Sequence, residues 1–135
     1  MVCIYCSGQT KVVNSRQQAR SNRVWRRRQC LACAAVFSTE EAVRHELAWR
    51  VKDGRHLQPF LRDKLFLSLY ESCRHRKTAL SDAGGLTETV IKKLRTYTAD
   101  GTVSPQDIAR VAQVALNRFD RAAGVQYQAF HGVKR

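Results

Sequence analysis

Two short stretches, Cys3-Ile-Tyr-Cys6 and Cys30-Leu-Ala-Cys33, decide how the first third of this chain folds. A C-x-x-C pair places two thiolates on the same side of a tight turn. Two such turns, brought together, offer four sulfurs to one tetrahedral Zn²⁺ ion, and the 23 residues between them are enough for a β-hairpin. The spacing therefore predicts one zinc ion bound by Cys3, Cys6, Cys30 and Cys33. Because protein ligands close all four positions, the metal is expected to be structural and not catalytic.

Other uses of paired cysteines are weaker or stay open. Disulfides are disfavoured because the N-terminus runs straight into Cys3 and shows no secretion signal. A redox pair normally lies between a strand and a helix of an α/β pattern, which the sequence lacks. An iron–sulfur cluster uses the same four thiolates, so the sequence does not exclude it. Cys73 falls on the apolar stripe of a predicted helix and is expected to be a buried structural thiol.

The charge of the chain is strongly positive and unevenly distributed. Its formal net charge is +13, and residues 1–39 contain seven Lys or Arg but no Asp or Glu. A small basic unit without carboxylates favours a polyanionic partner over a merely solubilising surface. No apolar run approaches the ~18–20 residues that cross a bilayer, so a cytoplasmic chain without a membrane partner is expected.

The residue pattern changes near residues 40–48 and predicts an α+β chain. Predicted strands cover residues 11–13, 23–28 and 35–39, residues 40–44 form the connection, and a further strand covers 47–51 before a turn at 53–54. Predicted helices cover residues 59–73, 86–97, 105–119 and 120–131. Ser104 is expected to cap the third helix, with Pro105 in its first position. Gly124 weakens the fourth helix by about 1 kcal/mol relative to Ala.

The order of several short motifs resembles one family. Cys3-x-x-Cys6, Lys-Val-Val-Asn-Ser-Arg at 11–16, Arg-Arg-Arg-Gln-Cys-Leu-Ala-Cys at 26–33 and Phe-Ser-Thr at 37–39 are similar to the zinc ribbon of NrdR proteins, bacterial transcriptional repressors of ribonucleotide reductase genes. Val51-Lys52, Gln58-Pro59-Phe60 and Lys64-Leu65 are similar to the opening of an ATP-cone, the nucleotide-sensing domain of that family. The resemblance implies a DNA-binding zinc ribbon over residues 1–44 and a mainly helical ATP-cone with a short β-hairpin over residues 47–135.

The resemblance also implies a function. By it, the ribbon reads paired boxes in promoter DNA, and ATP or dATP bound to the cone changes oligomerisation and thereby operator binding. The implied partners are double-stranded promoter DNA, adenine nucleotides and further copies of the chain, in the bacterial cytoplasm at the nucleoid. Two departures stand out: Asn14 replaces the family's Asp, and Lys52-Asp53-Gly54-Arg55 replaces Lys-Arg-Asp-Gly. The sequence has no P-loop and no catalytic set, so ATP is expected to be an effector and the chain is not expected to be an enzyme.

The candidate contacts to DNA and nucleotide are mainly cationic side chains. A guanidinium can bind a phosphate through two hydrogen bonds or pair with O6 and N7 of guanine, and the sequence does not say which arginine does which. The DNA candidates are Arg16, Arg23, Arg26, Arg27 and Arg28. Given the resemblance, the nucleotide candidates are Lys52 and Lys64, then Arg55 and Arg62, together with Phe60. The alternative is a basic zinc-ribbon module that binds RNA or the ribosome and carries a helical protein-interaction domain. Nucleotide binding separates the two.

Overall fold

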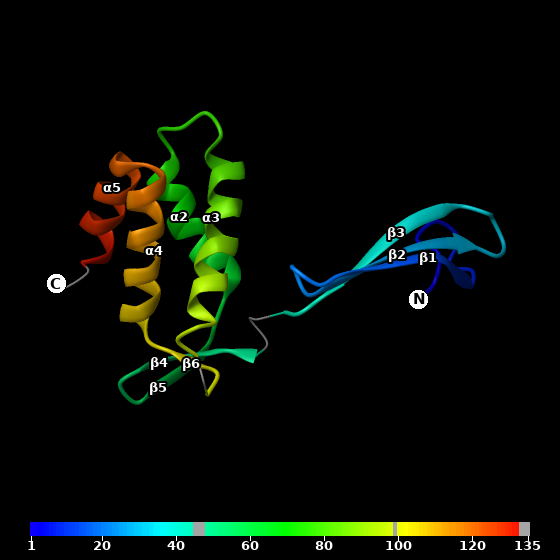
Figure 1. Cartoon of the computed structure of the whole chain (residues 1–135), viewed down its shortest axis with the longest axis horizontal. Helices are drawn as coiled ribbons and strands as arrows, with labels where there is room; N and C mark the ends of the chain where they lie inside the picture. The colour runs from blue at the N-terminus through cyan, green and yellow to red at the C-terminus, as the bar shows by residue number, and fades with distance from the viewer. Residues whose placement is uncertain (45–47, 99, 133–135) are drawn as a thin grey trace. The chain divides into compact units, whose positions relative to one another are not determined.

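The computed structural model describes residues 1–44, 48–98 and 100–132, and the chain divides into two compact units, Met1–Arg44 and His45–Arg135 (Figure 1). The first unit is a β-sheet and the second is mainly helical. The predicted α+β class is therefore confirmed.

The first unit is a three-stranded antiparallel sheet in the order β1-β2-β3. β1 spans Thr10–Gln18, β2 spans Arg23–Cys30 and β3 spans Val36–Ala42. All three predicted strands are present. The predicted connection at residues 40–44 is wrong in its first part, because residues 40–42 continue β3 and pair with residues 23–25 of β2. Two carboxylates, Glu40 and Glu41, thereby join the basic sheet.

A β-bulge in β1 sets the direction of the side chains that follow it. Val12 pairs with Arg28 and Asn14 pairs with Arg27, so Val13 is an extra residue in β1. Successive residues of a strand point to opposite faces, so one added residue moves every later side chain to the other face. The bulge therefore places Asn14 on the face of the sheet that carries Arg27.

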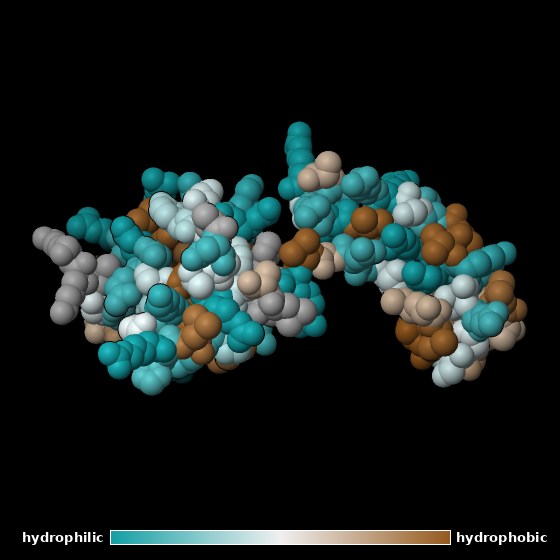
Figure 2. Space-filling model, turned by 90° about the horizontal axis from the view of Figure 1, so that it is seen from below, coloured by the Kyte–Doolittle hydropathy of each residue, from teal (hydrophilic) through white to brown (hydrophobic). Residues whose placement is uncertain are grey.

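The first unit has almost no hydrophobic core. Within residues 1–44, all of which are described, only Cys3 and Cys30 are buried, while side chains such as Ile4 and Leu31 are exposed. Figure 2 shows hydrophobic residues, in brown, at the surface of this unit. A module that buries so little apolar surface needs a cross-link or a metal to stay folded. The cysteines are the groups that can provide it.

The described part of the second unit consists of four helices and a small sheet. The helices are α2 (Arg62–Cys73), α3 (Ala79–Leu94), α4 (Pro105–Phe119) and α5 (Arg121–His131). β4 (Arg50–Asp53) pairs antiparallel with β5 (His56–Pro59) and parallel with β6 (Thr102–Val103). The helices lie side by side, and the strands lie at one end of them (Figure 1). A buried cluster that includes Leu69, Val90 and Leu116 fills the space between the helices.

The starts of the last two helices follow signals in the sequence. Ser104 Oγ accepts the backbone N–H of Asp107 at 3.0 Å, and Pro105 is the first residue of α4, as predicted. Asp120 caps α5, because its side chain accepts backbone N–H groups from the first turn of that helix. Both caps satisfy N–H groups that have no partner inside the helix.

Gly124 has a packing reason for its place in α5. A Cβ added there would lie 1.9 Å from Oδ1 and 3.2 Å from Cα of Asn117 in α4. The backbone carbonyl of Gly124 also accepts a hydrogen bond from Gln113 Nε2 at 2.8 Å. Glycine is therefore needed at this position, despite its low helix propensity, because α4 and α5 approach each other closely there.

Three predicted boundaries in the second unit are wrong. The strand predicted at 47–51 is β4, which begins at Arg50, and Leu47 lies outside the described residues. Trp49 instead packs in the core, with its ring 5.4 Å from that of Phe60. The helix predicted from residue 59 begins at Arg62, because Pro59 ends the edge strand β5, where its missing N–H removes no ladder bond.

The third wrong boundary is that of α3, which was expected over residues 86–97. It begins at Ala79 and ends at Leu94. Gly84 and Gly85 interrupt the apolar pattern in its first half, and that interruption hid the earlier start. β6 was not predicted, because two residues carry no periodic signal. No helix in the described ranges is long and apolar enough to cross a bilayer.

Candidate functional site

The two C-x-x-C turns have matching backbone geometry. In each, the N–H of the first cysteine donates to the carbonyl five residues on, at 2.8 Å for Cys3 and 2.9 Å for Cys30. The residues that directly follow the second cysteines, Ser7 and Ala34, both have a φ of 59°. A left-handed residue at this point folds the chain back beside its own cysteines. The sequence therefore builds the same thiol-presenting turn twice.

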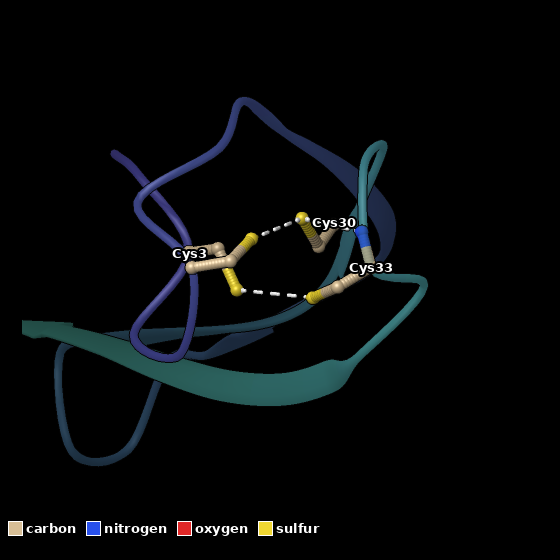
Figure 3. A group of neighbouring side chains, drawn as sticks. Cys3, Cys30 and Cys33 are labelled. Atoms are coloured by element: carbon tan, nitrogen blue, oxygen red, sulfur yellow. Dashed lines mark hydrogen bonds between the residues drawn. The ribbon is translucent and has the colours of Figure 1, made fainter.

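The four sulfurs converge on one point. All four Sγ atoms lie within 4.8 Å of one another, with 3.7 Å between Cys3 and Cys33 and 3.5 Å between Cys6 and Cys30. Figure 3 shows the side chains of the two turns pointing toward each other. A tetrahedral ion with bonds of about 2.3 Å to sulfur requires sulfurs about 3.8 Å apart. The cluster has the size for one such ion and leaves no room for a cluster of several iron and sulfide ions.

Hydrogen bonds shift the pKa values of Cys30 and Cys33 in opposite directions. The backbone N–H of Cys33 donates to Cys30 Sγ at 3.4 Å, and this bond is the main cause that lowers the pKa of Cys30 to about 6. The N–H of Ala35 acts to lower the pKa of Cys33, but the neighbouring thiols of Cys6 and Cys30 raise it to about 12. Thiolates this close repel one another, so all four are ionised together only around a cation. The donor set therefore fits one structural Zn²⁺ ion.

The two glutamates of β3 hold two of the candidate DNA-binding arginines. Arg26 Nη1 donates to Glu41 Oε2 at 2.7 Å, and Arg23 Nη1 lies 3.5 Å from both carboxylate oxygens of Glu40. A third candidate, Arg28, donates through Nε to Thr39 Oγ1 at 3.2 Å. These contacts exist because β3 continues beyond residue 39 and brings both glutamates next to β2.

Two candidate arginines differ from these three. Within the described residues, neither Arg16 nor Arg27 has a carboxylate partner. Arg27 is also the only exposed residue of the central strand β2. The structure thus brings all five candidate arginines onto one small sheet. Three of them contact side chains of β3, whereas Arg16 and Arg27 have no carboxylate partner among the described residues.

A pocket of about 320 Å³ lies between the β4–β5 hairpin and the first turns of α2 and α4. Two of the five candidate nucleotide contacts line it, namely Phe60 and Lys64. Phe60 is only 2% exposed and forms part of the pocket wall from within the core. Pro105, at the start of α4, and Ile108 close the side that faces the helices. The pocket therefore combines an apolar wall, one lysine, one carboxylate, that of Asp53, and a helix N-terminus.

The other three nucleotide candidates lie outside the lining of this pocket. Arg62 is held by Glu88, with Nη2 and Nε at 2.7 and 3.1 Å from Oε1. Lys52 lies on β4, and its positive charge helps to lower the pKa of Asp100. The main cause of that lowering is the backbone N–H of Thr102. Arg55 is exposed in the turn between β4 and β5.

A larger groove of about 520 Å³ runs between α3 and α4. Its cationic lining residues are Lys93, Arg110 and Arg118, which the sequence patterns do not single out. Arg110 is paired with Asp107, so its charge is partly compensated. This groove is thus a second cationic hollow on the helical unit.

Comparison with known proteins places the chain in a family. The zinc-ribbon family model described as "Transcriptional repressor NrdR-like, N-terminal domain" matches residues 1–41. A protein named transcriptional repressor NrdR from Symbiobacterium thermophilum is 35% identical over 136 residues, covering 100% of this chain and 87% of that protein. This chain belongs to the NrdR family. An NrdR from Heliobacterium modesticaldum is 30% identical over 132 residues, covering 97% of this chain and 86% of that protein.

Membership of the NrdR family confirms the resemblance drawn from the motifs. The matched range 1–41 includes all four clustered cysteines, which supports their assignment to one structural zinc. The relatives carry the name of transcriptional repressors and not of enzymes. The roles of individual arginines and lysines toward DNA and nucleotide stay predictions.

Proposed function

We propose that this chain is a zinc-dependent, DNA-binding repressor of ribonucleotide reductase genes whose operator binding is controlled by adenine nucleotides. The observation that carries the proposal is the basic sheet built on a closed cluster of four cysteines in an NrdR chain. A closed tetrahedral site leaves no open position for substrate, so the ion holds the sheet and takes no part in a reaction. The chain binds and does not catalyse.

Binding to DNA follows from the charge of the sheet. Its arginines form bidentate hydrogen bonds with phosphate oxygens or with guanine, and each neutralised phosphate releases counterions. Affinity for DNA must therefore fall steeply with salt. If about six phosphates are neutralised, the loss between 50 and 200 mM salt is roughly 10³-fold.

The nucleotide is proposed to bind in the pocket beneath the β4–β5 hairpin. Its volume of about 320 Å³ lies within the range of small-molecule sites. Lys64 can neutralise a phosphate, and the N-terminus of α4 offers positive partial charge on the same side. The apolar wall with Phe60 is suited to the adenine base. Lys52 and Arg55, on the hairpin, reach the phosphates if the hairpin moves on binding.

Regulation requires two states of the assembly with different nucleotide affinity. A nucleotide shifts the assembly only by the difference between its affinities for the two states, and by linkage DNA shifts nucleotide affinity in return. We infer that dATP favours the assembly that binds the operator. Ample deoxynucleotide then represses the reductase genes.

The site is tested by nucleotide binding to two charge-matched variants. Replacing both Lys52 and Lys64 by Ala is expected to abolish ATP and dATP binding, measured by calorimetry, while the zinc content stays unchanged. Replacing Lys93 and Arg118 by Ala removes the same charge from the groove between α3 and α4 and is expected to leave nucleotide affinity intact. The opposite pattern would move the nucleotide to that groove. Binding of neither nucleotide to the unmodified chain would favour the RNA- or ribosome-binding alternative.

A further inference from the structure

The strand register sorts the side chains of the ribbon sheet onto two faces, because directly paired residues of antiparallel strands share a face. One face, called here the open face, carries Lys11, Asn14, Arg16, Arg23, Trp25, Arg27, Ser38 and Glu40. The other, called the packed face, carries Val12, Val24, Arg26, Arg28, Phe37, Thr39 and Glu41. The five candidate arginines are thereby divided between two surfaces that cannot both face one DNA duplex.

Exposure distinguishes the two faces in the middle of β2 and β3, whereas the residues of β1 after Thr10 are exposed on both faces. Along β3, Ser38 on the open face is exposed, while Phe37 and Thr39 on the packed face are partly buried. On β2 the only exposed residue is Arg27, which belongs to the open face. In this middle part of β2 and β3, the face that carries Arg27 is therefore the more exposed one.

The packed-face arginines already have partners. Arg26 donates to Glu41 at 2.7 Å with its side chain 31% exposed, and Arg28 donates to Thr39 at 3.2 Å. To contact DNA, each would have to give up a contact with β3. These two arginines are thus bonded to side chains of β3 within the sheet.

The open face presents a polar pair that suits base recognition. Asn14 on β1 lies directly opposite Arg27 on β2, and both are exposed. Directly opposite residues lie about 5 Å apart, so both side chains can reach into the same part of a groove, and a β-ribbon fits the major groove. Arg pairs through two hydrogen bonds with guanine, and Asn does so with adenine. Arg16 and Lys11 belong to edge strand β1, where they can grip the phosphates beside the groove.

We propose that the open face is the DNA-reading surface, with Arg27 and Asn14 on base edges and Arg16 and Lys11 on phosphates, whereas Arg26 and Arg28 are structural. The assignment rests on the proposed function, because it gives individual residues their roles in the DNA binding proposed there. It also gives the β1 bulge a role, because only the extra residue Val13 places Asn14 and Arg16 beside Arg27.

Arg27 and Arg28 provide a matched test, because they are neighbours of equal charge on opposite faces. The zinc-loaded full chain and each variant are titrated, in the presence of dATP, with a reductase promoter duplex and with a scrambled duplex of equal length, at several salt concentrations. Arg27→Ala is expected to lower the preference for the promoter by about tenfold or more. Arg28→Ala is expected to leave this preference within about twofold once zinc content shows that the ribbon is intact.

Two further variants separate charge from base recognition. Arg27→Lys keeps the charge but loses the planar fork, so it is expected to lose preference while keeping the salt dependence. Arg16→Ala is expected to weaken both duplexes equally and to reduce the slope of log affinity against log salt by about 0.9. Wild-type preference that is lost in Arg28→Ala but kept in Arg27→Ala would overturn this inference alone. A wild-type chain that binds both duplexes equally would overturn the proposed function together with it.

Discussion

Arg26 donates a hydrogen bond from Nη1 to Oε2 of Glu41 at 2.7 Å, across strands β2 and β3 of the ribbon sheet. Its counterpart on the other face is the contact between Arg23 and Glu40, at 3.5 Å. Two glutamates that are neighbours in sequence thus lie on opposite faces of the sheet, each beside one arginine. This arrangement sets the charge of each face separately.

Removing the two carboxylates one at a time is expected to have unequal effects on DNA binding. Glu40 lies on the proposed DNA face, where its charge repels phosphate, whereas Glu41 lies on the other side. A unit charge about 4 Å away in water is worth about 1 kcal/mol, so Glu40→Gln should raise affinity for a scrambled duplex by up to roughly fivefold at low salt. Glu41→Gln should change it by less than about twofold. Fluorescence anisotropy measures both, and a larger gain from Glu41→Gln would contradict the assignment of faces.

The metal is expected to hold the ribbon together. Native mass spectrometry should find one zinc per chain, and Cys30→Ser should lose it, because structural zinc contributes about 10–16 kcal/mol of binding free energy that the almost coreless ribbon needs to fold. Cys73→Ala is the control, since that thiol is buried in the helical core and its pKa is raised by burial. The control should keep its zinc and lose only about 1 kcal/mol of stability. Full zinc occupancy in Cys30→Ser would refute the four-cysteine site.

Gly124→Ala is expected to destabilise the helical unit although alanine is the better helix former. The gain in helix propensity is about 1 kcal/mol. The added Cβ, however, meets Asn117 at 1.9 Å from Oδ1 and 3.2 Å from the less adaptable Cα. Overpacking of this kind costs about 1–3 kcal/mol, so the net effect on the urea unfolding free energy should be a loss. Adding Asn117→Ala should recover part of it. A Gly124→Ala variant more stable than wild type would show that α4 and α5 are not so close.

The Asp120 carboxylate makes the helical unit sensitive to acid. It accepts hydrogen bonds from His75 Nε2 at 3.1 Å and Arg76 Nη1 at 3.0 Å, and these contacts, that of His75 foremost, lower its pKa to about 2. Because the pKa in the folded state lies below the unfolded value of 3.8, the stabilisation is complete above about pH 4 and is lost as the pH falls toward 2.

Asp120→Asn isolates this ionisation, because asparagine can still cap α5. The variant should be less stable than wild type at neutral pH, and its stability should fall less steeply between pH 4 and 2. Thermal unfolding across this range measures the difference. Equal slopes for the two proteins would show that Asp120 does not contribute to acid unfolding.

The sequence was most informative where spacing alone determines geometry. Two C-x-x-C pairs specify a metal site whatever lies between them, and Ser104-Pro105 specifies a helix start locally. Tertiary packing decided the rest. The start of α3 was hidden by Gly84 and Gly85, which the bundle tolerates, and the extent of β3 depended on pairing with β2.

The division of the arginines could not be read from alternation within β2 alone. Alternation separates Arg26 and Arg28 from Arg27, but it does not say which face is open or which arginine has a partner. The partners and the faces of the arginines depend on Glu40 and Glu41 belonging to β3 and on the bulge at Val13, which no sequence pattern indicates. In the pocket beneath the β4–β5 hairpin, likewise, only two of the five nucleotide candidates came together, because hairpin and helix positions meet through the fold and not through sequence spacing.

The most direct test of the account is operator binding as a function of nucleotide. The zinc-loaded chain is titrated with a reductase promoter duplex in the absence of nucleotide, with ATP and with dATP, while mass photometry records the size of the assembly. The account predicts that dATP changes the assembly size and raises operator affinity by about fivefold or more relative to ATP, as a coupling of 1 kcal/mol or more requires. Equal sizes and equal affinities in all three conditions would contradict it.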